Sequence, residues 1–180
     1  IKIQGVKRQH LYQTFNKQEL EQLYENHQSE TNDQKRNKVI LGLIIWQGLG
    51  TSELSKLEEQ DLKLREGKIY ISGTRKSNER TLKLESTQIM DLMEYQFQVR
   101  PEYSKANPST QLLLTSNGGS NFQNIIVPLL KQLKKQNPKV SSMNQLRTSV
   151  ITHWLKNYNL RETQYMAGHR FVSSTEAYQI

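Results

Sequence analysis

Apolar residues recur at helical spacing over most of the chain, and the first stretch follows a capping signal. Asn16 with Glu19 three residues later has the form of a capping box, and an apolar helical stripe begins at Leu20. Residues 28–35 are polar and predict a loop. The segment Val39–Trp46 is apolar on nearly every side, which predicts a buried helix.

The same periodicity predicts further helices along the rest of the chain. They cover, in order, Ser52–Leu57, Gln88–Val99, Phe122–Lys135, 143–156, 160–167 and 174–178. A Ser or Thr cap is expected to open the first of these, and Pro101 to end the second. Pro128, inside the third, predicts either a kink or a position near the first turn.

Alternation of apolar and polar residues interrupts the helical pattern near the middle of the chain. Lys68–Ser72 and Arg80–Leu84 read as short strands, and the polar residues Gly73–Glu79 between them read as a hairpin tip. Leu112–Thr115 is a further candidate strand. The predicted fold class is therefore mainly α with a small antiparallel β-sheet, an α+β arrangement.

Composition narrows the function classes. A chain of 180 residues is most consistent with one core, and its net charge of +8, spread along the sequence, favours nucleic acid as the partner. There is no cysteine, and the four histidines show no metal-ligand spacing, so we expect no disulfide, metal or cofactor. No apolar run is long enough for a membrane span and no signal peptide is visible, so we expect a cytoplasmic protein.

The last third of the chain carries the candidate chemistry. The segment Asn144-Gln-Leu-Arg147 is followed by a Gly168-His169 pair, and Tyr178 stands nine residues after the histidine. This order resembles the catalytic box of the tyrosine recombinases, the phage-integrase and Xer-like family. In that family the box reads His-x-Leu-Arg-His, then Leu-Gly-His, then a tyrosine nine residues later.

The resemblance extends forward over most of the chain. Gln47-Gly-Leu-Gly50-Thr-Ser-Glu53-Leu54 is similar to the family's Thr-Gly-Leu-Arg-x-x-Glu-Leu. The hairpin tip is similar to the family's Gly-Lys-Gly-x-x-Glu-Arg turn, with a one-residue difference in length. The resemblance implies the catalytic-domain fold over residues 15–180, with residues 1–14 as a linker from a preceding DNA-binding domain.

What the resemblance implies for chemistry is transesterification at a DNA phosphate. Tyr178 takes the position of the nucleophile that forms a 3′-phosphotyrosine, Arg147 that of a phosphate clamp, and His169 that of a hydrogen-bond donor to the scissile phosphate. Arg75 and Lys76 compete for the hairpin's catalytic cation. Lys76 is favoured because a guanidinium is a poor proton donor near neutral pH. We also expect contacts with DNA from four of these residues, Arg75, Lys76, Arg147 and His169.

Two positions depart from the family pattern. Gly50 stands where the family has its first arginine, and Asn144 stands where it has the first histidine of His-x-x-Arg. A glycine offers no phosphate clamp, and an asparagine can donate a hydrogen bond but cannot exchange a proton near neutral pH. Glu53 matches an acidic position that supports the family's site from behind, and a first-turn glutamate favoured by the helix dipole would look the same.

Three functions remain open at this point. The first is a site-specific recombinase of a mobile element, weakened at Gly50 and Asn144, acting on double-stranded DNA as a homo-tetramer or with an active partner recombinase. The second is a catalytically degenerate relative that binds DNA without cutting. The third is a type IB topoisomerase-like enzyme, although the spacing of the box favours a recombinase.

Overall fold

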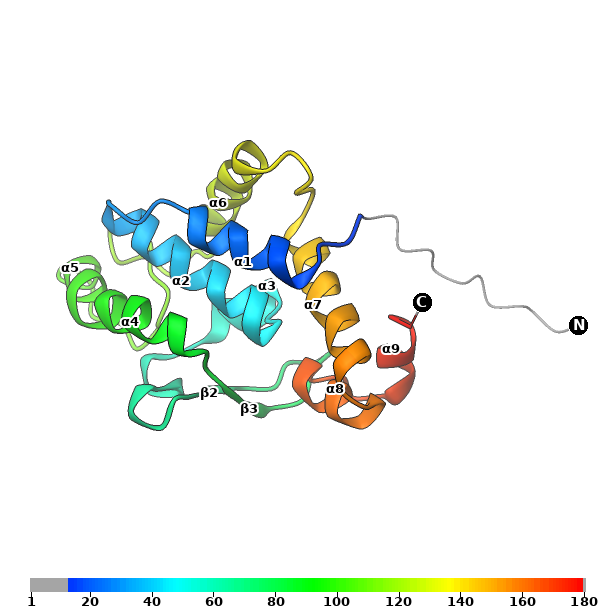
Figure 1. Cartoon of the computed structure of the whole chain (residues 1–180). Helices are drawn as coiled ribbons and strands as arrows, with labels where there is room; N and C mark the ends of the chain where they lie inside the picture. The colour runs from blue at the N-terminus through cyan, green and yellow to red at the C-terminus, as the bar shows by residue number, and fades with distance from the viewer. Residues whose placement is uncertain (1–12, 180) are drawn as a thin grey trace, which may run out of the picture.

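The computed structural model describes residues 13–179 as a mainly helical molecule with a small sheet along one side (Figure 1). The predicted linker, residues 1–14, lies almost entirely outside the described residues. The helices are α1 (Lys17–Asn26), α2 (Asn32–Gln47), α3 (Thr51–Lys56), α4 (Ser86–Glu94), α5 (Arg100–Tyr103), α6 (Gln123–Gln136), α7 (Met143–Asn157), α8 (Leu160–Ala167) and α9 (Val172–Glu176). Short 3₁₀ turns lie at Glu59–Asp61 (η1) and Leu64–Glu66 (η2).

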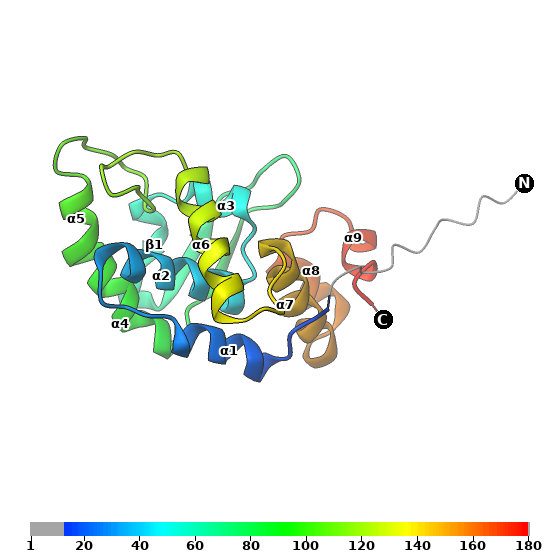
Figure 2. The same ribbon diagram turned by 90° about the horizontal axis from the view of Figure 1, so that it is seen from above.

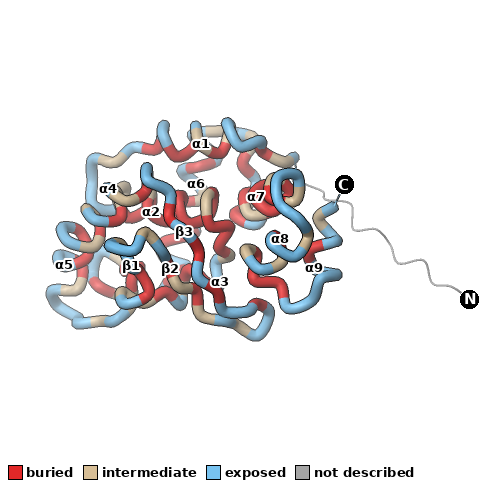
Figure 3. Tube along the Cα trace, turned by 60° about the horizontal axis from the view of Figure 1, so that its bottom comes forward, coloured by how far each residue is buried: buried red, intermediate tan, exposed pale blue. Residues whose placement is uncertain are grey.

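Helix α2 forms the centre of the core. Its residues from Val39 to Ile45 are all buried, as the apolar segment predicts, and α1, α4 and α7 pack against it (Figure 2). Figure 3 shows buried positions running through α2, α7 and β3, while the peripheral loops are exposed. Among the described residues, no helix is both long and apolar enough to cross a membrane.

The sheet has three antiparallel strands in the order β1 (Leu62–Lys63), β2 (Lys68–Ile71), β3 (Arg80–Lys83). The two predicted strands are confirmed, and their register pairs Ile69 with Leu82 so that both side chains face the core. Strand β1 was missed because two residues are too short to show alternation. Residues 72–79 form the loop between β2 and β3, which we call the hairpin loop.

Helix α2 starts earlier than the polar pattern suggested. Residues 32–35, predicted as loop, are its first turn, because Thr31 accepts from the Gln34 amide and the Gln34 side chain accepts from the Thr31 amide. At α3 the predicted Ser or Thr cap is wrong: Gly50 is the N-cap, and the Glu53 side chain accepts a hydrogen bond from the Gly50 amide at 3.2 Å.

Two other predictions are wrong in the middle of the chain. Pro101 does not end its helix, because residues Tyr95–Val99 form a π-helical turn (η3) that changes the register before the proline, and α5 continues beyond it. Leu112, Leu113 and Leu114 are buried, but residues 112–115 form no strand. Gln111, the residue before this segment, forms an isolated β-bridge with Glu58. Pro128 lies inside α6 rather than in its first turn.

Candidate active site

Arg147 is fixed at the junction of three helices. It lies on the first half of α7, where its Nε donates to the Gly48 carbonyl oxygen at 2.9 Å and its Nη2 donates to the Ala167 carbonyl oxygen at 3.0 Å. These carbonyls end α2 and α8. Among residues 13–179 its guanidinium makes no other hydrogen bond, so three of its five N–H groups are available for an anion such as a phosphate.

A buried ion pair lies beneath this arginine. Glu53 Oε1 accepts from Arg80 Nη2 at 3.0 Å, and its Oε2 accepts from the Ser77 hydroxyl at 3.1 Å and from Arg80 Nη1. Burial alone would raise the pKa of the Glu53 carboxyl, but the hydrogen bonds and charge of Arg80 outweigh it and hold the pKa below its ordinary value. The carboxylate therefore stays ionised and ties α3 to β3 and the hairpin loop.

Arg80 explains why a glycine precedes the candidate histidine. Its Nε donates to the Met166 carbonyl oxygen at 2.8 Å, which brings the guanidinium against the end of α8. Gly168 ends that helix with φ +71°, and a Cβ there would lie 2.4 Å from Arg80 Nη1. Both the positive φ and the close approach require glycine.

His169 is buried, and its ring contacts Thr175 and Tyr178. Its Nδ1 lies 2.8 Å from the hydroxyl oxygen of Thr175, which is fully buried, and its ring stacks on Tyr178 with centroids 5.6 Å apart and an interplanar angle of 17°. Burial lowers the pKa of His169 to about 4, helped by the charges of Arg147 and Arg80. The imidazole is neutral at pH 7, and in the tautomer whose Nδ1 accepts from the Thr175 hydroxyl, Nε2–H is a donor.

Tyr178 follows α9 and is half-buried, partly packed against the core. Its backbone amide donates to the Thr175 carbonyl oxygen at 3.0 Å. Thr175 therefore contacts both the histidine ring and the backbone of the tyrosine. This places the Tyr178 ring in contact with His169, whose own backbone follows the Gly168 turn that ends α8 beside Arg147.

The hairpin loop is docked onto the same turn. The Asn78 amide donates to the Gly168 carbonyl oxygen at 2.8 Å, and Ser77 forms an isolated bridge with His169. Arg75 and Lys76 lie just before these contacts, and both side chains are exposed. Both cationic side chains lie on the loop beside the site, and the structure does not distinguish which of them is the catalytic cation.

Gly50 and Asn144, the two predicted departures from the family pattern, both lie near Arg147. A Cβ built on Gly50 would lie 3.9 Å from Arg147 Cδ, 3.9 Å from its Nε and 3.9 Å from Glu53 Oε1. Asn144 is exposed on α7, one helical turn before Arg147 and on the same face. A side chain at position 50 would therefore start beside Arg147.

A comparison with known families assigns the chain. The model of the phage integrase family matches residues 13–179, which is nearly the whole described molecule. The chain belongs to the phage integrase family. It is a tyrosine recombinase catalytic domain, as the resemblance of its sequence implied.

Several relatives of this domain are known. The tyrosine recombinase XerD of Staphylococcus epidermidis is 32% identical over 150 residues, covering 82% of this chain and 50% of the relative. The XerD of Staphylococcus haemolyticus is 32% identical over 164 residues, covering 89% of this chain and 55% of the relative. The chain therefore spans about half the length of these recombinases.

Solved structures share the fold. A XerA recombinase superposes with a TM-score of 0.77 at 21% identity, covering 96% of this chain and 60% of that one. A XerH site-specific recombinase bound to a palindromic difH substrate, in a post-cleavage complex, superposes with a TM-score of 0.78 at 21% identity, covering 93% of this chain and 49% of that one. The mainly helical prediction with a small antiparallel sheet is confirmed.

Three supporting residues of this recombinase domain had no predicted role. Arg80 was visible only as part of the hairpin motif, and Thr175 as a threonine three residues before the tyrosine. Arg170 follows His169 directly, and its Nη2 donates to the Thr74 carbonyl oxygen at 2.5 Å. Arg80 and Arg170 contact segments far away in sequence, and such contacts leave no local pattern.

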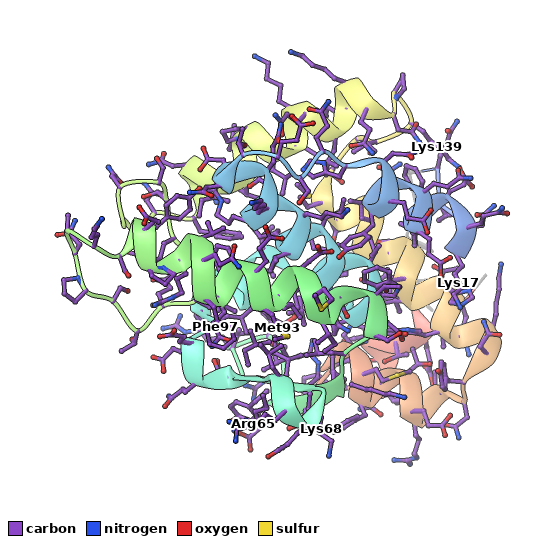
Figure 4. All side chains as sticks on the ribbon, turned by 60° about the vertical axis from the view of Figure 1, so that its left-hand side comes forward. Lys17, Arg65, Lys68, Met93, Phe97 and Lys139 are labelled. Carbon is purple, nitrogen blue, oxygen red and sulfur yellow. The ribbon has the colours of Figure 1, made fainter. Side chains whose placement is uncertain are left out.

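A separate surface feature shares no residue with this site. A groove runs between η2 and the α4–η3 helix, lined by Leu62–Glu66, Met93, Gln96 and Phe97. Figure 4 shows Met93 and Phe97 on α4–η3 above the turn that carries Arg65. We therefore assign this groove no part in the chemistry of Arg147, His169 and Tyr178.

Proposed function

We propose that this domain binds duplex DNA and cleaves and rejoins its strands through a covalent bond between Tyr178 and a 3′-phosphate, at a rate reduced by the loss of the first arginine. One observation carries the proposal: Arg147 is bonded to the Ala167 carbonyl at the end of α8, two residues before His169, and the neutral His169 ring stacks on the Tyr178 ring. The XerH relative bound to its difH substrate supports DNA as the partner.

The proposed reaction uses side chains of this chain. Arg147 and the Nε2–H of His169 hold the nonbridging oxygens of the phosphate and neutralise the charge of the pentavalent transition state. The Tyr178 hydroxyl releases its proton to solvent, and its oxygen forms a bond to phosphorus as the bond to the 5′-oxygen breaks. Lys76 gives the leaving 5′-oxygen a proton. Attack by the 5′-hydroxyl of another strand reverses the step and restores a phosphodiester.

The missing arginine sets the expected rate. Losing one preorganised donor to a developing charge costs on the order of 10²–10³ in rate. Space beside Arg147 is present at Gly50, but no side chain fills it. We therefore infer slow cleavage by the domain alone, and strand exchange as a homo-tetramer on DNA or in an assembly with an active recombinase.

A non-cutting, DNA-binding relative is the second candidate. Gly50 and Asn144 favour it, since both remove groups that the family uses at the phosphate. Such a protein would keep the affinity that Arg147 and the hairpin cations supply and would lose only the covalent step.

A selection for covalent capture tests the proposal without knowledge of the target site. The natural full-length protein is mixed with a random-sequence duplex pool, each member nicked so that the cleaved fragment diffuses away. DNA that remains attached under denaturing conditions is then sequenced. An enriched sequence supports a cutting recombinase. Capture by a Gly50→Arg, Asn144→His variant alone supports the non-cutting relative.

A further inference from the structure

The hairpin loop has an internal turn that fixes the backbone around Lys76. The Thr74 hydroxyl accepts from the amides of Lys76 and Ser77 at 3.1 Å each, and the Thr74 amide donates to the Ser77 carbonyl oxygen at 2.9 Å. Because these bonds bracket Lys76, the backbone of Lys76 moves with Thr74 and Ser77 as one unit.

This unit is held against the site on both sides of Lys76. After Lys76, Ser77 pairs with His169 and donates to Glu53, and Asn78 donates to Gly168. Before Lys76, the contact with the site is the hydrogen bond from Arg170 Nη2 to the Thr74 carbonyl oxygen. Removing Arg170 would leave the loop anchored only on the C-terminal side of Lys76.

We propose that Arg170 is a positioning residue that holds the hairpin loop against the Gly168–His169 turn and so aims Lys76 at the leaving 5′-oxygen. This inference rests on the proposed function, because it assumes that Lys76 supplies the proton for that oxygen. Arg170 itself need not touch the phosphate, since its guanidinium is directed at a backbone carbonyl.

The leaving group gives a chemical test of this role. When the P–O5′ bond breaks, the 5′-oxygen must take a proton, and Lys76 would lose one. If sulfur replaces the bridging 5′-oxygen, the leaving thiolate is stable without a proton, so cleavage no longer needs the acid. A residue that acts only by aiming Lys76 should become unimportant on the sulfur substrate, whereas a residue that holds the phosphate should not.

The experiment measures single-turnover adduct formation by the natural full-length protein on a captured duplex, with oxygen or sulfur at the bridging position. We expect Arg170→Ala to slow cleavage of the oxygen substrate about 10–100-fold, because a displacement of about 1 Å can cost 10²-fold. On the sulfur substrate it should stay within about threefold of the natural protein. Arg170→Lys, which keeps a donor for Thr74, should recover most of the rate on oxygen.

Three other variants control the comparison. Lys76→Ala should show the same sulfur rescue, and the double variant with Arg170→Ala should be no slower than Lys76→Ala alone, because the two act on one step. Arg161→Ala, an exposed arginine on α8, should leave both rates unchanged. An equal loss on both substrates, or effects of Arg170→Ala and Lys76→Ala that multiply, would overturn the proposal.

A second readout does not depend on cleavage of DNA. The loop offers trypsin two bonds, after Arg75 and after Lys76, and both side chains are exposed. Arg170→Ala should speed trypsin cleavage there several-fold while Arg161→Ala leaves it unchanged, and unchanged loop cleavage in Arg170→Ala would refute the anchoring. If no variant forms an adduct, the proposed function fails, and the trypsin result still decides whether Arg170 anchors the loop.

Discussion

Gly50→Arg is the sharpest perturbation that the structure suggests. Gly50 has φ −83° and ψ 164°, an extended conformation open to any residue, so the substitution introduces no backbone strain. A Cβ there would make ordinary contacts of 3.9 Å with Arg147 and Glu53. The new guanidinium would start beside Arg147 and share the space in which a phosphate is proposed to bind.

The effect on folding should be small. Replacing a glycine N-cap costs at most about 1 kcal/mol, and the lower entropy of the unfolded chain offsets about 0.4–1 kcal/mol. The charge of the nearby Glu53 carboxylate also compensates the repulsion from Arg147. We therefore expect Gly50→Arg to change the free energy of unfolding by less than about 1 kcal/mol.

The effect on cleavage should be large. One added donor to the transition-state charge should raise the rate of adduct formation on the order of 10²–10³-fold. The assay follows single-turnover adduct formation on a nicked duplex by denaturing gel, with Gly50→Met as a control of similar length and no charge. If Gly50→Arg folds and binds DNA yet cleaves no faster than Gly50→Met, the assignment of Gly50 to the missing clamp is refuted.

Three further predictions concern charge. The pKa of His169 is near 4 in the folded protein and near 6.5 in the unfolded chain, so its contribution to the free energy of unfolding is complete above pH 6.5. That contribution is lost as the pH falls toward 4, by about 3 kcal/mol. His169→Asn should flatten this part of the stability–pH curve, and an unchanged curve would contradict the burial argument. Glu53→Ala should lower the free energy of unfolding by about 3–5 kcal/mol, since it leaves the Arg80 guanidinium, whose side chain is 0% exposed, without its partner; a loss under 1 kcal/mol in chemical denaturation would argue against it. DNA affinity should fall steeply with salt, with a log–log slope of about −3 if Arg147 and the two hairpin cations each neutralise a phosphate, and a flat response would exclude a phosphate-binding surface.

The order of the candidate site residues could be predicted from the sequence, but the residues that hold them in place could not. Arg147, His169 and Tyr178 were predicted because their order and spacing resemble the family's catalytic box. Arg80 was not, because its role depends on contacts with distant segments, and Thr175 was not, because the family pattern quoted for the box assigns it no role. Glu53 had two interpretations, and the structure supports both: it caps the Gly50 amide and pairs with Arg80.

The errors in the fold have the same origin. Pro101 was expected to end a helix, but the π-turn before it shifts the hydrogen-bond register. The proline therefore lies in the first turn of α5, and the chain stays helical. Leu112–Thr115 has the composition of a strand, yet no neighbouring strand pairs with it over its length among the described residues. The choice between Arg75 and Lys76 also stays a prediction, since both are exposed on one loop.

The central claim is that Tyr178 forms the covalent bond to DNA, and mass spectrometry of the captured adduct tests it most directly. The natural full-length protein is reacted with the nicked duplex, digested with protease and nuclease, and searched for the peptide that carries a nucleotide. We expect the nucleotide on Tyr178, formed at a slow rate. We expect no adduct from Tyr178→Phe, which should still bind the duplex. A nucleotide on another residue, an adduct that persists in Tyr178→Phe, or an adduct formed only after Gly50→Arg with Asn144→His would contradict it.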